Sequence, residues 1–323
     1  MCHESFRLTV ITGALASAVV VFGSDSVLGQ TSPSRPPDFS HVEIKVSKLA
    51  DNFYRLEGQG EATGASGLGG AIGVLVGSDG VLLVDSQFAP LTDKVIAAIR
   101  QISDGRIRFL VNTHVHGDHT GGNENLGRMG VTILAREELR RRLAEPTTGG
   151  VPPRPAALPM VTYGGPTTIH MNGEDVQLLP IPTAHTDGDT LVVFPKANVI
   201  MTGDLFRTLG YPIIDRLNGG TLPGLLGALN EIIRLSSATT KVVPGHGEVG
   251  SRSAVVAYRD MIVAVRDQVA PMVRRGMTLQ QVLAATPTSS YNSGVRGWDA
   301  AVPGGGTTAD RFVSQLYAEL EMQ

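Results

Sequence analysis

The sequence predicts an α+β fold in which two β-sheets stack face to face between outer layers of helices, a four-layer αββα sandwich. The chain has 323 residues, of which 42% are hydrophobic, so it is long enough to bury a large core. Each half begins with short apolar, strand-like segments and continues with segments of helical periodicity. A sheet with an apolar face must pack against another layer, and two such halves can do so by stacking their sheets.

The first half supplies one sheet of this prediction. Apolar runs bounded by turn residues predict strands, as on either side of Gly77-Ser78-Asp79-Gly80. Apolar side chains then recur on one helical face from Leu91 to Ile102. Residues 146–166 hold six prolines and are expected to form a loop. The expected strands are 41–46, 52–56, 71–76, 81–85, 109–111 and 131–134, and the expected helices are 91–102 and 137–143.

The second half repeats this order of elements without a close sequence repeat. Its strands are short apolar runs, and its helices continue to the end of the chain as a helical C-terminal extension. The expected strands are 167–171, 175–181, 190–194, 199–201 and 241–243, and the expected helices are 222–235, 254–275, 279–285 and 309–320.

The N-terminus is typical of an export signal. Arg7 precedes an apolar run at residues 8–22 that is short for a membrane span, and small residues follow it. We therefore expect a signal peptide over residues 1–29, a flexible leader over 30–40 and a single folded domain over 41–323. This organisation predicts a periplasmic or secreted protein with no stable membrane insertion after signal removal. An uncleaved membrane anchor is the alternative.

Composition narrows the classes of partner and of chemistry. The net charge is −3 and no basic patch stands out, so we expect a small-molecule substrate and no nucleic-acid partner. The single cysteine, Cys2, lies inside the expected signal peptide. The mature chain would therefore have neither a disulfide framework nor a cysteine nucleophile.

The strongest motif is a cluster of potential metal ligands at the end of an expected strand. His114 and His116 are two residues apart, so on extended backbone their side chains point the same way. Gly117 permits a sharp turn, after which Asp118 and His119 begin a helix and face a second position. Imidazole and carboxylate groups bind Zn²⁺, iron and manganese, and polar side chains this dense need a common partner when buried.

Three more potential ligands occur at distant junctions between strands and loops. His185 precedes an expected strand, whereas Asp204 and His246 each follow one. Such junctions are where a rigid scaffold presents functional side chains. The two remaining histidines of the expected domain, His41 and His170, are interpreted as ordinary surface or strand residues.

Together with Asp85, these residues resemble the five ordered motifs of the metallo-β-lactamase superfamily, over about residues 42–247. The resemblance implies the αββα fold, with metals held at the edges of the two sheets. It also implies two divalent metal ions, one bound by His114, His116 and His185, the other by Asp118, His119 and His246, with Asp204 bridging both.

Departures from subgroups of the family refine this expectation. Zinc-dependent β-lactamases of the best-known subclass carry Cys at the position of Asp204, so this site resembles that of glyoxalase II-like members. Oxygen-reducing diiron relatives carry Glu where His116 stands, which disfavours that branch. Asp85 is either a carboxylate that supports a metal ligand without touching the metal or a strand-end turn residue. The metals are expected to be Zn²⁺, with iron or manganese as alternatives.

These features favour an enzyme, a metal-dependent hydrolase. We expect that two adjacent metals would supply a hydroxide nucleophile and Lewis acidity for attack on an acyl carbonyl, and that Asp118 would bind metal and orient the nucleophile. β-Lactams, lactones, esters and thioesters are the expected substrates. A phosphodiesterase, a mononuclear iron persulfide dioxygenase-like enzyme and a non-catalytic member of the fold are the alternatives.

Three loops are expected to set specificity: residues 58–70, 146–166 and 206–220. Within the last loop, Arg207 and Tyr211 are candidate substrate contacts, although each alone is also compatible with an ordinary loop residue. The sequence does not fix the exact substrate or the oligomeric state.

Overall fold

The computed structural model describes Met1 and residues 38–60, 68–145 and 154–322. The predicted signal peptide and most of the predicted leader lie outside these residues. Strands β1 to β7 form one sheet in sequence order, and the second sheet has the order β12–β11–β10–β9–β8. The strands are β1 (Glu43–Ala50), β2 (Phe53–Gln59), β3 (Ile72–Leu75), β4 (Val81–Val84), β5 (Ile107–Val111), β6 (Thr132–Arg136), β7 (Val161–Tyr163), β8 (Thr167–Met171), β9 (Glu174–Pro180), β10 (Thr190–Phe194), β11 (Val199–Met201) and β12 (Lys241–Val243).

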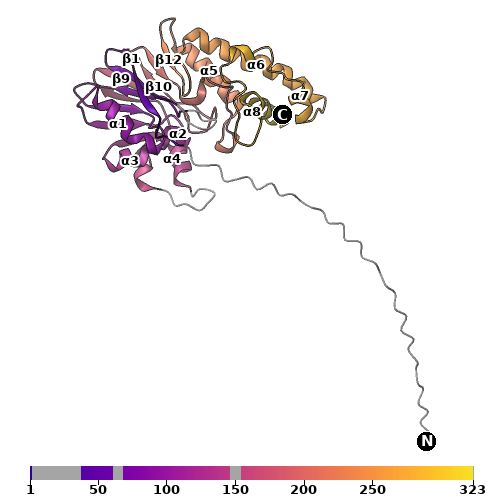
Figure 1. Cartoon of the computed structure of the whole chain (residues 1–323), viewed down its shortest axis with the longest axis horizontal. Coiled ribbons are helices and arrows are strands. Elements are labelled where there is room, and N and C mark those ends of the chain that lie inside the picture. The colour runs from indigo at the N-terminus through magenta and orange to yellow at the C-terminus, as the bar shows by residue number, and fades with distance from the viewer. Residues whose placement is uncertain (2–37, 61–67, 146–153, 323) are drawn as a thin grey trace. The chain divides into compact units, whose positions relative to one another are not determined.

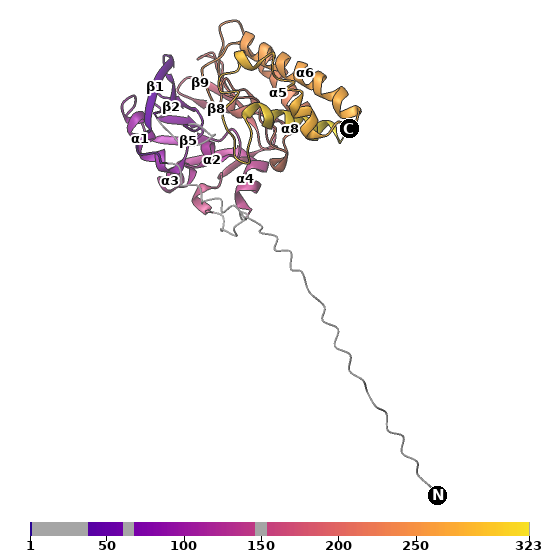
Figure 2. The same cartoon turned by 45° about the vertical axis from the view of Figure 1, so that its right-hand side comes forward.

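Helices cover the outer faces of the two sheets. In both views the helices of the first half and those of the second half lie on opposite sides of the paired sheets (Figures 1 and 2). The predicted αββα architecture is therefore confirmed. The helices are α1 (Thr92–Arg100), α2 (Gly117–Thr120), α3 (Asn123–Arg128), α4 (Glu137–Ala144), α5 (Leu222–Leu235), α6 (Arg252–Arg274), α7 (Leu279–Ala284) and α8 (Thr308–Leu320).

Alternation along the strands explains how one sheet serves two layers of core. In β4, Leu82 and Val84 belong to the cluster between the two sheets, whereas Val81 and Leu83 pack with α1 on the other face. Successive side chains of a strand point to opposite faces, so a strand buried on both faces is apolar throughout. A third cluster joins the outer face of the second sheet to α5, α6 and α8.

Parallel pairing brings the ends of several strands to the same region of each sheet. Strands β4, β5, β6 and β7 pair in parallel, as do β11 and β12. The loops that follow parallel strands emerge at one edge, where ligands are commonly bound in α/β proteins. The chain from Pro37 onward forms one compact unit. No helix in the described part of the chain is both long and apolar enough to cross a membrane.

The prediction that residues 146–166 form a loop was wrong in part, because this segment contains β7. Residues 146–153 of this loop are outside the described residues. Strand β7 is only three residues long and pairs with β6 at the edge of its sheet, where nearby prolines are tolerated. Its Tyr163 hydroxyl donates a hydrogen bond to Thr190 Oγ1 at 3.0 Å, so the loop is attached to the second sheet. Helix α3 was also missed, because it is a single short segment rich in polar residues.

Candidate metal centre

Seven predicted ligands from five segments of the chain meet at the edges of the two sheets. They follow β5, begin α2, precede β10, follow β11 and follow β12, in that order. Five of the seven are buried, and the other two are partly buried. The seven residues are His114, His116, Asp118, His119, His185, Asp204 and His246.

The side chains form two groups, and within each group the potential ligand atoms lie within 4.8 Å of one another. In the first group His116 Nδ1 lies 3.1 Å from His185 Nε2, and the His114 ring lies edge-on to both rings. In the second group His246 Nε2 lies 3.1 Å from Asp118 Oδ2 and 3.4 Å from His119 Nε2. The grouping is the one that the family resemblance implied.

Asp204 lies between the two groups. Its Oδ1 is 3.4 Å from His119 Nε2 and 3.3 Å from His246 Nε2, and its Oδ2 is 3.9 Å from His185 Nε2. Burial opposes ionisation of this carboxyl. The Arg207 guanidinium and the His246 and His119 rings outweigh burial and hold the pKa of Asp204 well below its ordinary value. A carboxylate that is ionised and has one oxygen toward each group is suited to bridge two metals.

Two histidines of the first group also have their other ring nitrogen held by the protein. His116 Nε2 lies 2.7 Å from Asp215 Oδ2, and His185 Nδ1 lies 2.9 Å from the Ile213 carbonyl oxygen. Because a ring nitrogen bonded in this way carries the proton, the opposite nitrogen keeps its lone pair for a metal.

Asp85 supplies the same support in the second group. Its Oδ2 lies 2.7 Å from His119 Nδ1 and accepts a hydrogen bond from the Thr113 hydroxyl at 2.7 Å, while Oδ1 accepts one from the Thr113 N–H. Thr113 Oγ1 is in turn 3.0 Å from His114 Nδ1. The structure thus places Asp85 against a predicted ligand, not at an isolated turn.

The donor set fits a transition metal on observations within the site itself. His114 Nε2 and Asp204 Oδ1 are buried and make no hydrogen bond within the part of the chain that is described. Burial lowers the pKa of His114 well below its ordinary value and lowers that of His185 to about 3, so both rings are neutral at pH 7. Buried, neutral imidazoles and unpartnered oxygens are costly alone but are good ligands for Zn²⁺ and similar ions.

Access to the site is uneven. The side chains of His116 and Asp118 are 26% and 14% exposed, whereas that of Asp204 is 3% exposed. A cleft of about 490 Å³ borders His246 and is lined by charged side chains, including Arg55 and Arg296. A volume of this size is typical of small-molecule sites. Of the seven potential ligands, His246 is the one that lines this cleft.

The two predicted substrate contacts have other roles in the structure. Arg207 is buried and forms an ion pair with Asp204, so it affects the metal centre through the charge of that carboxylate. The prediction for Tyr211 is wrong, because its ring is fully buried and stacks on Phe312 while its hydroxyl donates a hydrogen bond to Asn292 Oδ1. The hydrophobicity of the segment around Tyr211 was the available signal that this residue belongs to the core.

The αββα fold and the two histidine–aspartate groups define a metal-binding protein whose site lies at the edges of two stacked sheets. The family model of the Metallo-beta-lactamase superfamily matches residues 65–246, which is more than half of the chain. The chain therefore belongs to the metallo-β-lactamase superfamily, as the sequence resemblance predicted.

Individual relatives are distant. A metallo-beta-lactamase type 2 of Bacillus cereus is 24% identical over 208 residues, which are 63% of this chain and 75% of the relative. A hydroxyacylglutathione hydrolase of Nitrosococcus oceani is 29% identical over 160 residues, which are 49% of this chain and 55% of the relative. Both relatives are hydrolases by name.

Solved structures share the fold. A metallo-beta-lactamase from Pontibacter korlensis has a TM-score of 0.57 and 21% identity, covering 68% of this chain and 99% of that chain. The DIM-1 metallo-beta-lactamase has a TM-score of 0.55 and 18% identity, covering 68% of this chain and 97% of that chain.

Proposed function

We propose that this protein is an exported, binuclear metal-dependent hydrolase that cleaves a small molecule at an acyl carbonyl. The observation that carries the proposal is the pair of ligand groups joined by Asp204. Two divalent metals held there, which we propose to be Zn²⁺, would supply Lewis acidity and a nucleophile at neutral pH.

The protein's own residues prepare the site for this chemistry. Burial opposes ionisation of Asp118, but the His119 and His246 rings dominate and hold its pKa well below the ordinary value. Its carboxylate is thus ionised at neutral pH and is partly exposed, so it can bind a metal and orient a nucleophile as a hydrogen-bond acceptor. Asp85 and Asp215 fix the His119 and His116 rings, so that the ligands need little reorganisation.

The donor set and the fold's relatives favour an acyl substrate. All seven proposed ligands are nitrogen or oxygen donors, and relatives named as a metallo-beta-lactamase and a hydroxyacylglutathione hydrolase act on carbonyl compounds. The chain has a net charge of −3, which offers little to neutralise a phosphate backbone. We therefore propose a β-lactam, lactone, ester or thioester as the substrate, with β-lactams and lactones first.

A parallel rate comparison tests the reaction class. The metal-loaded protein is assayed with a β-lactam, a lactone, a thioester and a phosphodiester, with and without chelator. We expect chelator-sensitive turnover of an acyl compound, and loss of it in His114→Ala but not in His170→Ala, which removes an exposed histidine that belongs to neither ligand group. Fastest chelator-sensitive turnover of the phosphodiester would instead support the nuclease-like alternative.

The proposed export has its own test. An apolar run after Arg7 and a mature sequence without cysteine support a signal peptide that ends near Gly29. Cell fractionation and N-terminal sequencing should find a periplasmic or secreted protein that begins near Gln30. Cytoplasmic protein that begins at Met1 would refute this part of the proposal.

A further inference from the structure

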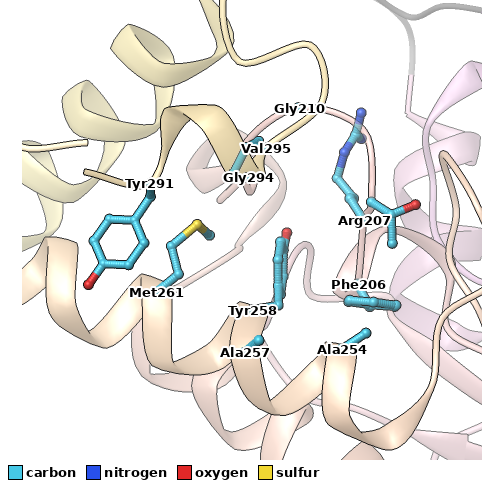
Figure 3. Close-up of a pocket in the computed structure, with 11 residues that line it drawn as sticks. Phe206, Arg207, Gly210, Ala254, Ala257, Tyr258, Met261, Tyr291, Gly294 and Val295 are labelled. Carbon is cyan, nitrogen blue, oxygen red and sulfur yellow. The ribbon is translucent and has the colours of Figure 1, made fainter. Parts of the chain in front are cut away.

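A second cavity lies beside the metal centre and is separate from the cleft that borders His246. It has a volume of about 340 Å³ and lies between α6 and the segment that precedes α8. Its lining shares no residue with the lining of the cleft. Figure 3 shows Phe206, Tyr258, Met261, Tyr291 and Val295 around it, with Arg207 at one end. The walls are therefore mostly apolar, with a guanidinium at one end.

The Tyr258 hydroxyl is an unused donor on this cavity. The residue is 9% exposed, and its hydroxyl oxygen is buried without a hydrogen-bond partner among the described residues. In Figure 3 the side chain rises from α6 with the hydroxyl toward the space beside Arg207. Buried hydroxyls normally form a hydrogen bond, because an unpaired one loses its hydrogen bonds to water without replacement. Burial also raises the pKa of Tyr258, so the hydroxyl remains a donor.

The surroundings carry an excess of positive charge. Arg207 pairs with Asp204 through Nη1, and its Nε donates a hydrogen bond to the Leu209 carbonyl oxygen at 3.4 Å. Arg311 of α8 is close enough that burial and Arg207 lower its pKa to about 10. Its Nε is buried and unpartnered, and no ion pair of Arg311 occurs within the described ranges. Asp204 thus pairs with Arg207 and also faces the proposed metals, which leaves the Arg311 charge without an ion-pair partner among the described residues.

We propose that this cavity binds a small organic carboxylate with an apolar body. The carboxylate accepts hydrogen bonds from Arg207 and the Tyr258 hydroxyl, and the body packs against Met261, Tyr291 and Val295. Only an acceptor satisfies two donors at once, and an anion also offsets the unpaired guanidinium charge. The mostly apolar lining excludes a bare inorganic ion as the best ligand. The site is independent of the reaction proposed above.

Calorimetric titration of the metal-loaded protein with phenylacetate tests the proposal. Phenylacetamide is the matched neutral probe, with the same apolar body and no charge. We expect one saturable phenylacetate site per chain and at least about tenfold weaker binding of phenylacetamide. Tyr258→Phe removes only the unpartnered hydroxyl, so it should fold normally and bind phenylacetate at least about tenfold more weakly.

A pair of variants on α6 separates this cavity from the metal centre, which could also attract a carboxylate. Ala257 lines the cavity and is exposed, so Ala257→Phe should fill its mouth and abolish binding. Gln268→Phe adds the same side chain at an exposed position of the same helix outside the cavity and should bind phenylacetate normally. The proposal would be overturned if either Tyr258→Phe or Ala257→Phe bound phenylacetate as tightly as the unaltered protein does. It would also be overturned if the unaltered protein did not bind phenylacetate.

Discussion

Ring orientation at the metal centre is decided by residues that do not belong to the proposed ligand set. His116 Nε2 is held by Asp215, so Nδ1 is the nitrogen that faces His185. The Asp215 carboxylate outweighs burial and raises the pKa of His116, which shows how strongly the two groups interact. Carboxylates in this position fix the tautomer of a metal-binding histidine and increase its basicity.

Asp215→Asn should weaken zinc binding by about 10- to 100-fold without unfolding the protein, because it removes the negative charge that orients the His116 ring and increases its basicity. Competition with a chelator of known zinc affinity measures the change. Asp175→Asn is the matched control, because Asp175 makes the same 2.7 Å contact with His170 at an exposed site. Equal zinc affinities in the two variants would contradict a supporting role for Asp215.

Asp85→Ala should lower the free energy of unfolding by about 2–4 kcal/mol, because it leaves the Thr113 N–H, the Thr113 hydroxyl and His119 without their acceptor in a buried position. Asp85→Asn keeps one acceptor oxygen and should lose less. Urea unfolding of the metal-free proteins measures both values. A change in the free energy of unfolding below about 0.5 kcal/mol for the alanine variant would show that the hydrogen bonds of Asp85 do not stabilise the fold.

Sequence reasoning found the proposed ligands but missed Asp215. The ligands stand out because they are dense within one motif or sit beside strand ends. Asp215 is 99 residues from His116, and an isolated aspartate beside Arg216 has no pattern that distinguishes it from a turn residue. Tyr211 was misassigned because loop position does not reveal burial, which here depends on packing against Phe312 of α8.

At the scale of elements, strands that are apolar on both faces were the most predictable. Strands β10 and β11 are buried throughout and begin and end where expected, because turn residues bound each apolar run. The expected bounds of β8 and β12 also match, although these two strands carry exposed polar residues. β1 was less predictable at its C-terminal end, because it is exposed or half-buried throughout and its pairing continues past the apolar run to Ala50. β7 depends on pairing with β6, which no local pattern reveals.

The segment before β3 approaches the metal centre too closely for a side chain. A Cβ built on Gly70 would overlap the His119 ring. Gly70→Ala should therefore displace His119 and reduce the metal content of the second group, while the strands remain folded. Gly164→Ala, where a Cβ meets open space, is the control. Elemental analysis with circular dichroism tests this, and full metal content in Gly70→Ala would refute the proposed constraint.

Helix α5 contains two glycines with opposite expected responses to alanine. Gly227 is exposed and a Cβ there meets nothing within 4 Å, so Gly227→Ala should raise the free energy of unfolding by about 0.5–1 kcal/mol. At Gly224 a Cβ would overlap the Thr183 carbonyl oxygen, so Gly224→Ala should destabilise the protein. Thermal unfolding of both variants measures the difference, and the same sign for both would contradict this account.

At the scale of the whole molecule, the hydrophobic core and the metal centre make separable contributions. Three buried apolar clusters extend from the outer helices through both sheets, and none needs a metal to form. The order of elements predicted this layered plan. It did not predict the cavity beside α6, which depends on how the C-terminal segment packs. The metal-free protein should accordingly remain folded.

Metal removal should therefore lower stability without unfolding the chain. A ligand that binds only the folded state stabilises it by about 4 kcal/mol at a thousandfold excess over Kd, which corresponds to a Tm change of roughly 8–16 °C for a domain of this size. Elemental analysis should find close to two transition-metal ions per chain, and chelation should lower the Tm by that amount, with recovery on addition of zinc. One ion per chain would instead favour the mononuclear iron alternative.

The same Tm difference should shrink as the pH falls. Asp85 and Asp118 outweigh burial and raise the pKa of His119 well above its ordinary value, and Asp215 raises that of His116, so a metal must displace protons from both. In the metal-free protein, protonation of each of these histidines stabilises the fold at pH values below the ordinary histidine pKa of about 6.5. This stabilisation is lost as the pH rises through the raised pKa of the folded state. Lower pH thus weakens the metal-loaded state and favours the metal-free fold. Thermal unfolding with and without metal between pH 5 and 8 measures both effects, and a gap that widens toward pH 5 would contradict the assignment of these histidines as ligands.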